Sequence, residues 1–146
     1  MIRIYGAFAG GRFDTDVHLD VLASSLEQPG AVVWVDLDMP STDEVDAVAR
    51  ILHFHPLAVE DCVHYVELPK IDEFEDHAFV ITHGLRLTDE GEIEKVELDC
   101  FLGRHFLVSS HLTPSRSVSA MRERIQKQPE ILTRGADFLL HALLDM

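Results

Sequence analysis

Two adjacent carboxylates, Glu60 and Asp61, have the clearest capacity for chemistry in this sequence. They follow the apolar stretch 57–59 and bring two hard oxygen ligands close together. Mg²⁺ prefers such ligands and keeps most of its water, so one or two carboxylates are enough for a weak site. Acidic pairs are also common at solvated helix ends that bind no metal. The pair alone is therefore compatible with a weak divalent-cation site or with an ordinary surface.

Histidine and cysteine offer two further chemistries. His53 and His55 flank Phe54 and could bind zinc through imidazole nitrogen, but structural zinc needs four protein ligands and no cysteine pair accompanies them. Cys62 could act as a nucleophile with a histidine base. A free cysteine is more often a small buried hydrophobic residue. We therefore expect capping or surface histidines and a buried, inert Cys62.

Common enzyme motifs are absent from the sequence. There is no P-loop, no G-x-G-x-x-G, no G-x-S-x-G and no H-E-x-x-H. The chain carries 26 acidic and 12 basic residues, a net charge of −14, which disfavours nucleic acids and anionic membranes because phosphates would be repelled. Cations are the natural counterparts, although an acidic surface also serves solubility.

Length and composition indicate one compact domain, residues 1–146, that needs no disulfide. Cys62 and Cys100 lie far apart and no secretory leader precedes them, so we expect reduced thiols in a cytoplasmic setting. The longest apolar runs, such as 138–140 and 142–144, are far shorter than the roughly 18 to 20 residues of a membrane helix. The chain as it stands is not expected to span a bilayer.

Hydrophobic patterning predicts strands and helices in an order typical of a mixed fold. We expect strands over 2–8, 31–37, 78–87, 92–102 and 105–109, the last three as an antiparallel meander. Segment 31–37 is almost continuously apolar, as expected of a strand covered on both faces. The order predicts an α/β fold with a mixed, largely antiparallel sheet flanked by helices, an αβα sandwich.

Four helices are expected around this sheet. One starts at the capping box of Ser41 and Glu44, one runs from Pro56 to about residue 64, one follows Pro114, and the last begins near Gly135. The last is still in helical phase at Met146 with no cap or breaker, so we expect the natural protein to continue.

Five short segments, taken in order, resemble the cytoplasmic domain of the CorA family of divalent metal ion transporters. The segments are WVDL at 34–37, HPLAVED at 55–61, PKIDEFED at 69–76, FLGRHFLV at 101–108, and 135–145. HPLAVED and the PK-I-D-x-F block are the most specific. Residues 1–30 match no familiar pattern, and Leu68 stands where family members often carry a basic or amide residue.

The resemblance implies a function in metal transport and no enzymatic activity. It implies a stalk helix and two membrane helices beyond residue 146, a homopentamer in the full-length protein, and a cell inner or plasma membrane location with this domain facing the cytoplasm. Divalent cations, either Mg²⁺ or Co²⁺, would bind between neighbouring domains and favour the closed pore. The metal ligands would be Glu60, Asp61 and Asp145, completed by an acidic residue of the stalk.

Consequences and alternatives follow from the same resemblance. Without its stalk, the chain is expected to self-associate weakly or not at all and to bind Mg²⁺ no better than millimolar. One alternative is the same domain in a zinc transporter of the wider family, which the nine histidines slightly favour. Another is a cytosolic metal-dependent or cysteine-based hydrolase, against which the unfinished last helix counts.

Overall fold

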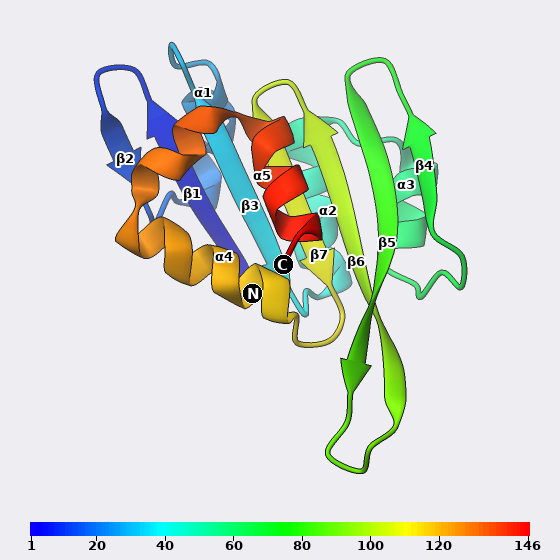
Figure 1. Ribbon diagram of the computed structural model, residues 1–146. Coiled ribbons are helices and arrows are strands. Elements are labelled where there is room, and N and C mark those ends of the chain that lie inside the picture. The colour runs from blue at the N-terminus through cyan, green and yellow to red at the C-terminus, as the bar shows by residue number, and fades with distance from the viewer.

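A computed structural model describes all residues, 1–146, and contains one seven-stranded sheet in the order β2-β1-β3-β7-β6-β5-β4 (Figure 1). Only β3 and β7 pair in parallel, while the other neighbours are antiparallel. This confirms the mixed, largely antiparallel sheet. The strands are β1 (Ile2–Phe8), β2 (Arg12–Asp14), β3 (Val32–Asp38), β4 (Lys70–Glu73), β5 (His77–Leu87), β6 (Ile93–Gly103) and β7 (Phe106–His111).

Helices cover both faces of the sheet, which confirms the αβα sandwich (Figure 1). No helix has the length and apolar character needed to cross a membrane. On one face lie η1 (Leu19–Val21), α1 (Leu22–Leu26), α2 (Thr42–Leu52) and α3 (Pro56–Cys62), and on the other lie α4 (Arg116–Lys127), η2 (Pro129–Arg134) and α5 (Ala136–Leu144).

Two separate hydrophobic cores result from this layering. Successive β3 residues alternate between them, because side chains along a strand point to opposite faces. Val35 packs in the core beneath α2 and α3, and Trp34 packs in the core beneath α4 and α5. Both residues are fully buried. The expectation of a strand covered on both faces is thus confirmed.

Capping interactions fix where α2 and α3 begin. Ser41 and Glu44 form the predicted capping box, and the Glu44 carboxylate also binds the amino terminus at 3.0 Å. α2 ends at His53, whose left-handed backbone (φ 57°) turns the chain. Two residues later the His55 ring accepts a hydrogen bond from the Leu57 amide and starts α3. The sharp turn places α3 beside α2 on the same face of the sheet.

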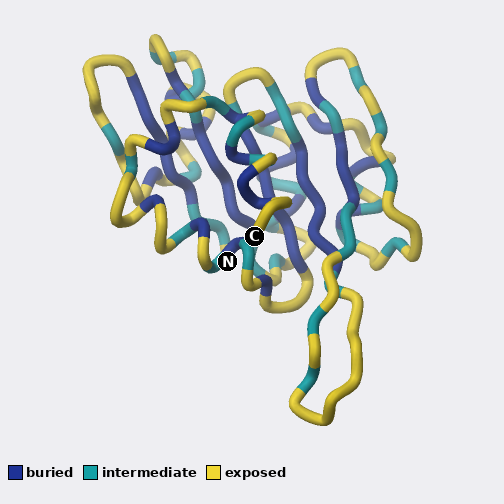
Figure 2. Tube along the Cα trace, in the orientation of Figure 1, coloured by how far each residue is buried: buried dark blue, intermediate teal, exposed yellow.

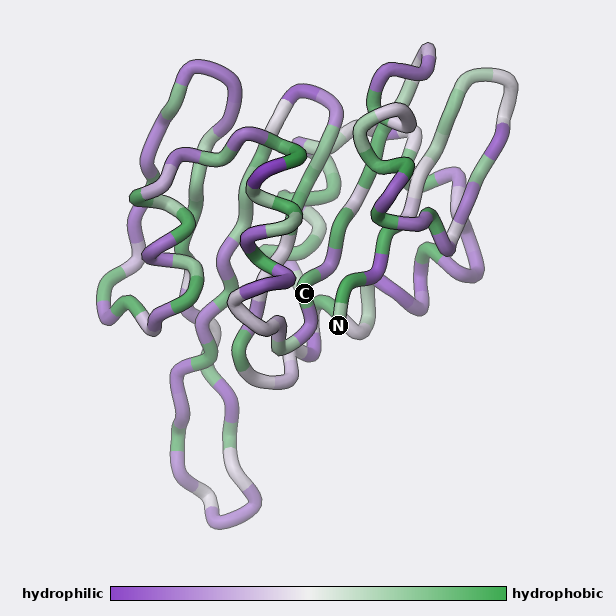
Figure 3. Tube along the Cα trace, turned by 180° about the vertical axis from the view of Figure 1, so that it is seen from behind, coloured by the Kyte–Doolittle hydropathy of each residue, from purple (hydrophilic) through white to green (hydrophobic).

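The ends of β5 and β6 project from the body of the molecule as a long hairpin (Figure 1). The predicted turn around Gly91 lies at its tip, and the hairpin is largely exposed (Figure 2). Hydrophilic and hydrophobic residues alternate along it when seen from the opposite side (Figure 3). Leu85, Leu87 and Ile93 are exposed there.

Candidate metal centre

Helix α3 determines how Glu60 and Asp61 are presented. Ala58 and Cys62, one turn apart, are buried in the core beneath the helix. The intervening pair consequently lies towards the solvent, with Glu60 exposed and Asp61 partly buried. The His55 ring at the start of α3 stacks on Phe74, with 4.6 Å between ring centroids, and ties the helix to the segment after β4.

Lys70 on β4 lies between two carboxylates. Its ammonium donates to Asp61 on α3 and, at 2.9 Å, to Asp72 on its own strand. Lys70 and Asp72 are two residues apart, so both point to the sheet face that α3 covers. Hydrogen bonds to Asp61 and then Asp72 raise the pKa of Lys70 above its ordinary value of 10.5.

A shallow depression of the surface, here called the α3–β4 depression, contains these groups. Its polar lining consists of four carboxylates and one ammonium, while Leu57, Ile71 and Phe74 supply apolar walls. Oxygen ligands of this kind suit hard cations. The polar residues are Glu60, Asp61, Lys70, Asp72 and Glu73.

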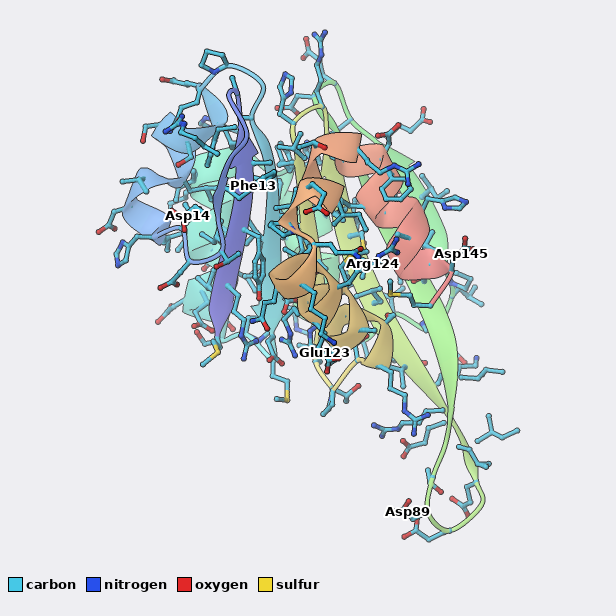
Figure 4. All side chains as sticks on the ribbon, turned by 60° about the vertical axis from the view of Figure 1, so that its left-hand side comes forward. Phe13, Asp14, Asp89, Glu123, Arg124 and Asp145 are labelled. Carbon is cyan, nitrogen blue, oxygen red and sulfur yellow. The ribbon has the colours of Figure 1, made fainter.

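Asp145, the third predicted ligand, does not line the α3–β4 depression. It is exposed at the end of α5, where the His141 ring is 3.5 Å from its carboxylate (Figure 4). α5 packs on the sheet face opposite to α3, so one molecule brings Glu60 and Asp61 together but not Asp145. Accordingly, no group of three or more His, Cys, Asp or Glu side chains in the chain is arranged to hold a metal ion.

The histidines and Cys62 have structural environments. His53 and His55 end and begin helices, as expected, and assemble no zinc site. Cys62 is fully buried, and burial raises its pKa to about 12, with further contributions from the charges of Asp99 and Glu97. A nucleophile must be an accessible thiolate. The expectation of a buried Cys62 is therefore confirmed.

Asp99 is a buried acid that the sequence analysis missed. It lies on β6 in register with Ser110 of β7, is 2% exposed, and one of its carboxyl oxygens has no hydrogen-bond partner. Burial, followed by the charges of Glu97 and Asp61, raises its pKa to about 8. Alternation with Leu98 and Cys100 suggests an exposed strand face, but here helices cover both faces. The only available signal was the apolar character of the flanking residues.

A buried ionic network joins the sheet to α4. Asp36 is fully buried and accepts hydrogen bonds from Ser109, His111 and Arg122. Burial lowers the pKa of His111, but the hydrogen bond and charge of Asp36 outweigh it and raise the pKa overall. Asp36 is thus a buried pairing residue that connects β3 to β7 and α4.

Comparison with known proteins gives a consistent result along most of the chain. The family model described as "CorA-like Mg2+ transporter protein" matches residues 29–146. YfjQ of Bacillus subtilis, named for metal ion transport, is 34% identical over 121 residues, or 82% of this chain and 37% of its own. The cobalt/magnesium transport protein CorA of Thermotoga maritima is 23% identical over 92% of this chain and 44% of its own. The chain thus spans less than half the length of these relatives.

Solved structures share the fold across nearly the whole chain, including residues 1–30. The soluble domain of CorA from Methanocaldococcus jannaschii superposes with a TM-score of 0.75 at 17% identity, covering 99% of this chain and 54% of that one. The cytoplasmic domain of ZntB from Vibrio parahaemolyticus gives a TM-score of 0.72 at 14% identity, covering 98% of this chain and 55% of that one. At such identities the likeness establishes the fold alone.

Proposed function

Because this chain belongs to the family of CorA-like Mg²⁺ transporter proteins, we propose that it is the N-terminal cytoplasmic domain of a divalent-cation transporter and senses the ion it transports. The observation that carries the proposal is the family match over residues 29–146, which includes all three candidate carboxylates. The proposed role is regulatory rather than enzymatic. The whole protein would lie in the cell inner or plasma membrane with this domain on the cytoplasmic side.

The position of the carboxylates supports a site shared between copies. Glu60 and Asp61 lie on α3 and Asp145 lies at the end of α5, on opposite faces of the sheet. In a ring of five copies, α3 of one subunit can face α5 of the next, and the three carboxylates can then meet at one ion. An acidic residue of the stalk helix would complete this set.

Electrostatics supplies the regulatory step. Each domain carries a net charge of −14, so neighbouring carboxylates repel one another when no cation lies between them. A bound Mg²⁺ or Co²⁺ removes this repulsion and favours the close arrangement of domains, in which the pore is closed. Loss of the ion releases the domains, which is a population shift driven by differential binding.

The test is ion entry through the whole protein reconstituted in lipid vesicles, with this domain facing the lumen. Co²⁺ entry is followed by quenching of trapped calcein while luminal Mg²⁺ is raised. We expect Mg²⁺ to inhibit entry into wild-type vesicles. Asp61→Asn and Asp145→Asn should each weaken this inhibition by about tenfold in Mg²⁺ concentration, since each removes one charged oxygen ligand of the cation.

Asp89→Asn provides the matched control. Asp89 lies at the exposed tip of the β5–β6 hairpin, away from α3 and α5, and its removal changes net charge equally (Figure 4). This variant should be inhibited like the wild type. Inhibition that survives both Asp61→Asn and Asp145→Asn would move the regulatory site away from these carboxylates.

A second experiment is needed to identify the transported ion, because the fold resembles the ZntB domain almost as closely as the CorA domain. The oxygen-only set of Glu60, Asp61 and Asp145 favours Mg²⁺ over Zn²⁺, which prefers sites with nitrogen or sulfur ligands. We therefore propose Mg²⁺ as the sensed ion and, from the family match and the named relatives, Mg²⁺ and Co²⁺ as the transported ions. Faster entry of Zn²⁺ than of Co²⁺, measured with a Zn²⁺-sensitive dye, would instead support the zinc transporter.

A further inference from the structure

Lys70 holds the position next to Asp61 that a metal ion would need. Its ammonium contacts the same carboxylate that is proposed as a ligand, and Asp72 holds that ammonium from the other side at 2.9 Å. The lysine comes from edge strand β4 and Asp61 from α3, so the contact joins two elements across the depression. An ion that binds Asp61 must compete with a cation that already belongs to the protein.

We propose that Lys70 is a built-in competitor that sets the metal concentration at which Asp61 becomes occupied. A divalent cation displaces the ammonium from Asp61, and Asp72 retains the displaced ammonium. This inference rests on the proposed metal site and adds two residues to it. Neither Lys70 nor Asp72 binds the ion itself.

Exposure of the three side chains makes such an exchange feasible. Between 32% and 40% of each side chain is accessible to solvent. Ion pairs with this exposure stabilise a protein only weakly, because water screens both charges. A hard dication at millimolar concentration can therefore displace the lysine, whereas a buried pair would resist it. The competition raises the metal concentration needed for half occupancy by a modest factor.

Asp72 has a distinct part in this exchange. Lys70 and Asp72 are on the same strand and the same face, so their contact can survive when Lys70 leaves Asp61. When a dication occupies Asp61, the displaced Lys70 ammonium can stay paired with Asp72. Without that partner, the ammonium would be unpaired close to the positive ion. Removing Asp72 should therefore make the lysine harder to displace.

The experiment measures the luminal Mg²⁺ concentration that half-inhibits Co²⁺ entry through the whole protein in vesicles. Lys70→Met should lower this concentration by up to about fivefold, the upper end of the range that corresponds to loss of a competing exposed ion pair. Lys70→Arg keeps the competing charge and should leave the value at or above that of the wild type. Lys95→Met removes one positive charge from the exposed hairpin and should leave the value unchanged.

A double-variant cycle separates retention of the lysine from direct ligation by Asp72. Asp72→Asn alone should raise the half-inhibiting concentration about two- to fivefold, because Lys70 then remains on Asp61. In the Lys70→Met background the same substitution should have no further effect, since no lysine remains to be retained. An equal loss in both backgrounds would make Asp72 a metal ligand and overturn its assigned role.

The two proposals fail in different ways. If Asp61→Asn abolishes inhibition but Lys70→Met leaves the half-inhibiting concentration unchanged, the sensor remains supported and the competitor is refuted. If Asp61→Asn leaves inhibition intact, the proposed site itself is refuted, and the competitor with it. The inference requires that Lys70→Met lower the half-inhibiting Mg²⁺ concentration by about two- to fivefold. Lys95→Met should not lower it, and Lys70→Met/Asp72→Asn should lower it as much as Lys70→Met does.

Discussion

The carboxylate of Asp36 on β3 lies 3.0 Å from the guanidinium of Arg122 on α4, although the two residues are 86 positions apart. The same guanidinium contacts Asp38 at 3.2 Å, and Asp38 binds Arg3 of β1 at 2.6 Å. The network therefore connects two strands to the helix that covers them. It determines how α4 docks on the sheet and stabilises one of the two helical layers.

Arg122→Met should destabilise the fold by about 2–3 kcal/mol, because it leaves the buried charge of Asp36 without its main partner. The expected loss of unfolding free energy is smaller than the largest cost of breaking a buried ion pair, since His111 and Ser109 still hydrogen-bond Asp36. Urea unfolding followed by circular dichroism measures the change. Arg124→Met, an exposed neighbour on the same helix, is the control and should change stability by less than about 0.5 kcal/mol (Figure 4). Equal losses for both variants would contradict the network's role.

Asp99 should make the free energy of unfolding depend on pH. Its pKa is about 8 in the folded protein against an ordinary value of 3.8, so the folded state binds more protons between these values. Stability is therefore fully present below about pH 4 and falls as pH rises through 8. One pKa unit corresponds to about 1.4 kcal/mol, so this shift amounts to on the order of 5 kcal/mol.

Asp99→Asn removes the titrating carboxyl and isolates this effect. The difference in unfolding free energy between variant and wild type should grow in favour of the variant from about pH 5 to about pH 9. Urea unfolding across that range provides the measurement. Asp89→Asn at the exposed hairpin tip should give a curve parallel to that of the wild type. A constant difference for Asp99→Asn would mean that Asp99 is ionised without penalty in the folded protein.

The two cysteine thiols should not react with thiol reagents in the native protein. Both are fully buried, and burial raises both thiol pKa values, that of Cys62 to about 12. Ellman's reagent should therefore detect no free thiol until denaturant is added, and two afterwards. Ala23→Cys on the exposed side of α1 supplies a positive control that should react at once. Rapid labelling of Cys62 in the native protein would reopen the possibility of a nucleophilic role.

Much of the fold follows from local patterns in the sequence. The capping box at Ser41 and the continuous apolar run of β3 predict elements that are confirmed nearly to the residue. Short or weakly patterned elements were not predicted, among them β2 and η2, because they depend on neighbours far away in the chain. The parallel pairing of β3 with β7 is also a long-range feature, and no local signal specifies it.

The candidate site is less accessible to sequence reasoning. Glu60 and Asp61 were identified from residue type and family resemblance, and α3 does present them to solvent. The contact of Asp61 with Lys70 was not predicted, because it depends on β4 lying at the sheet edge beside α3. The separation of Asp61 from Asp145 was not predicted either, because no local pattern specifies which sheet face a helix covers. Both relationships follow from topology.

The most direct test of the proposed shared site is disulfide cross-linking between copies of the whole protein reconstituted in lipid vesicles. The proposed site requires Asp61 of one copy to lie near Asp145 of the next, so the double variant Asp61→Cys/Asp145→Cys should form covalent dimers and larger species under mild oxidation. Each single variant should remain monomeric on a denaturing gel, and the buried native thiols should not interfere. Failure of the double variant to cross-link, while both introduced thiols react with a maleimide, would contradict a metal site shared between neighbouring domains.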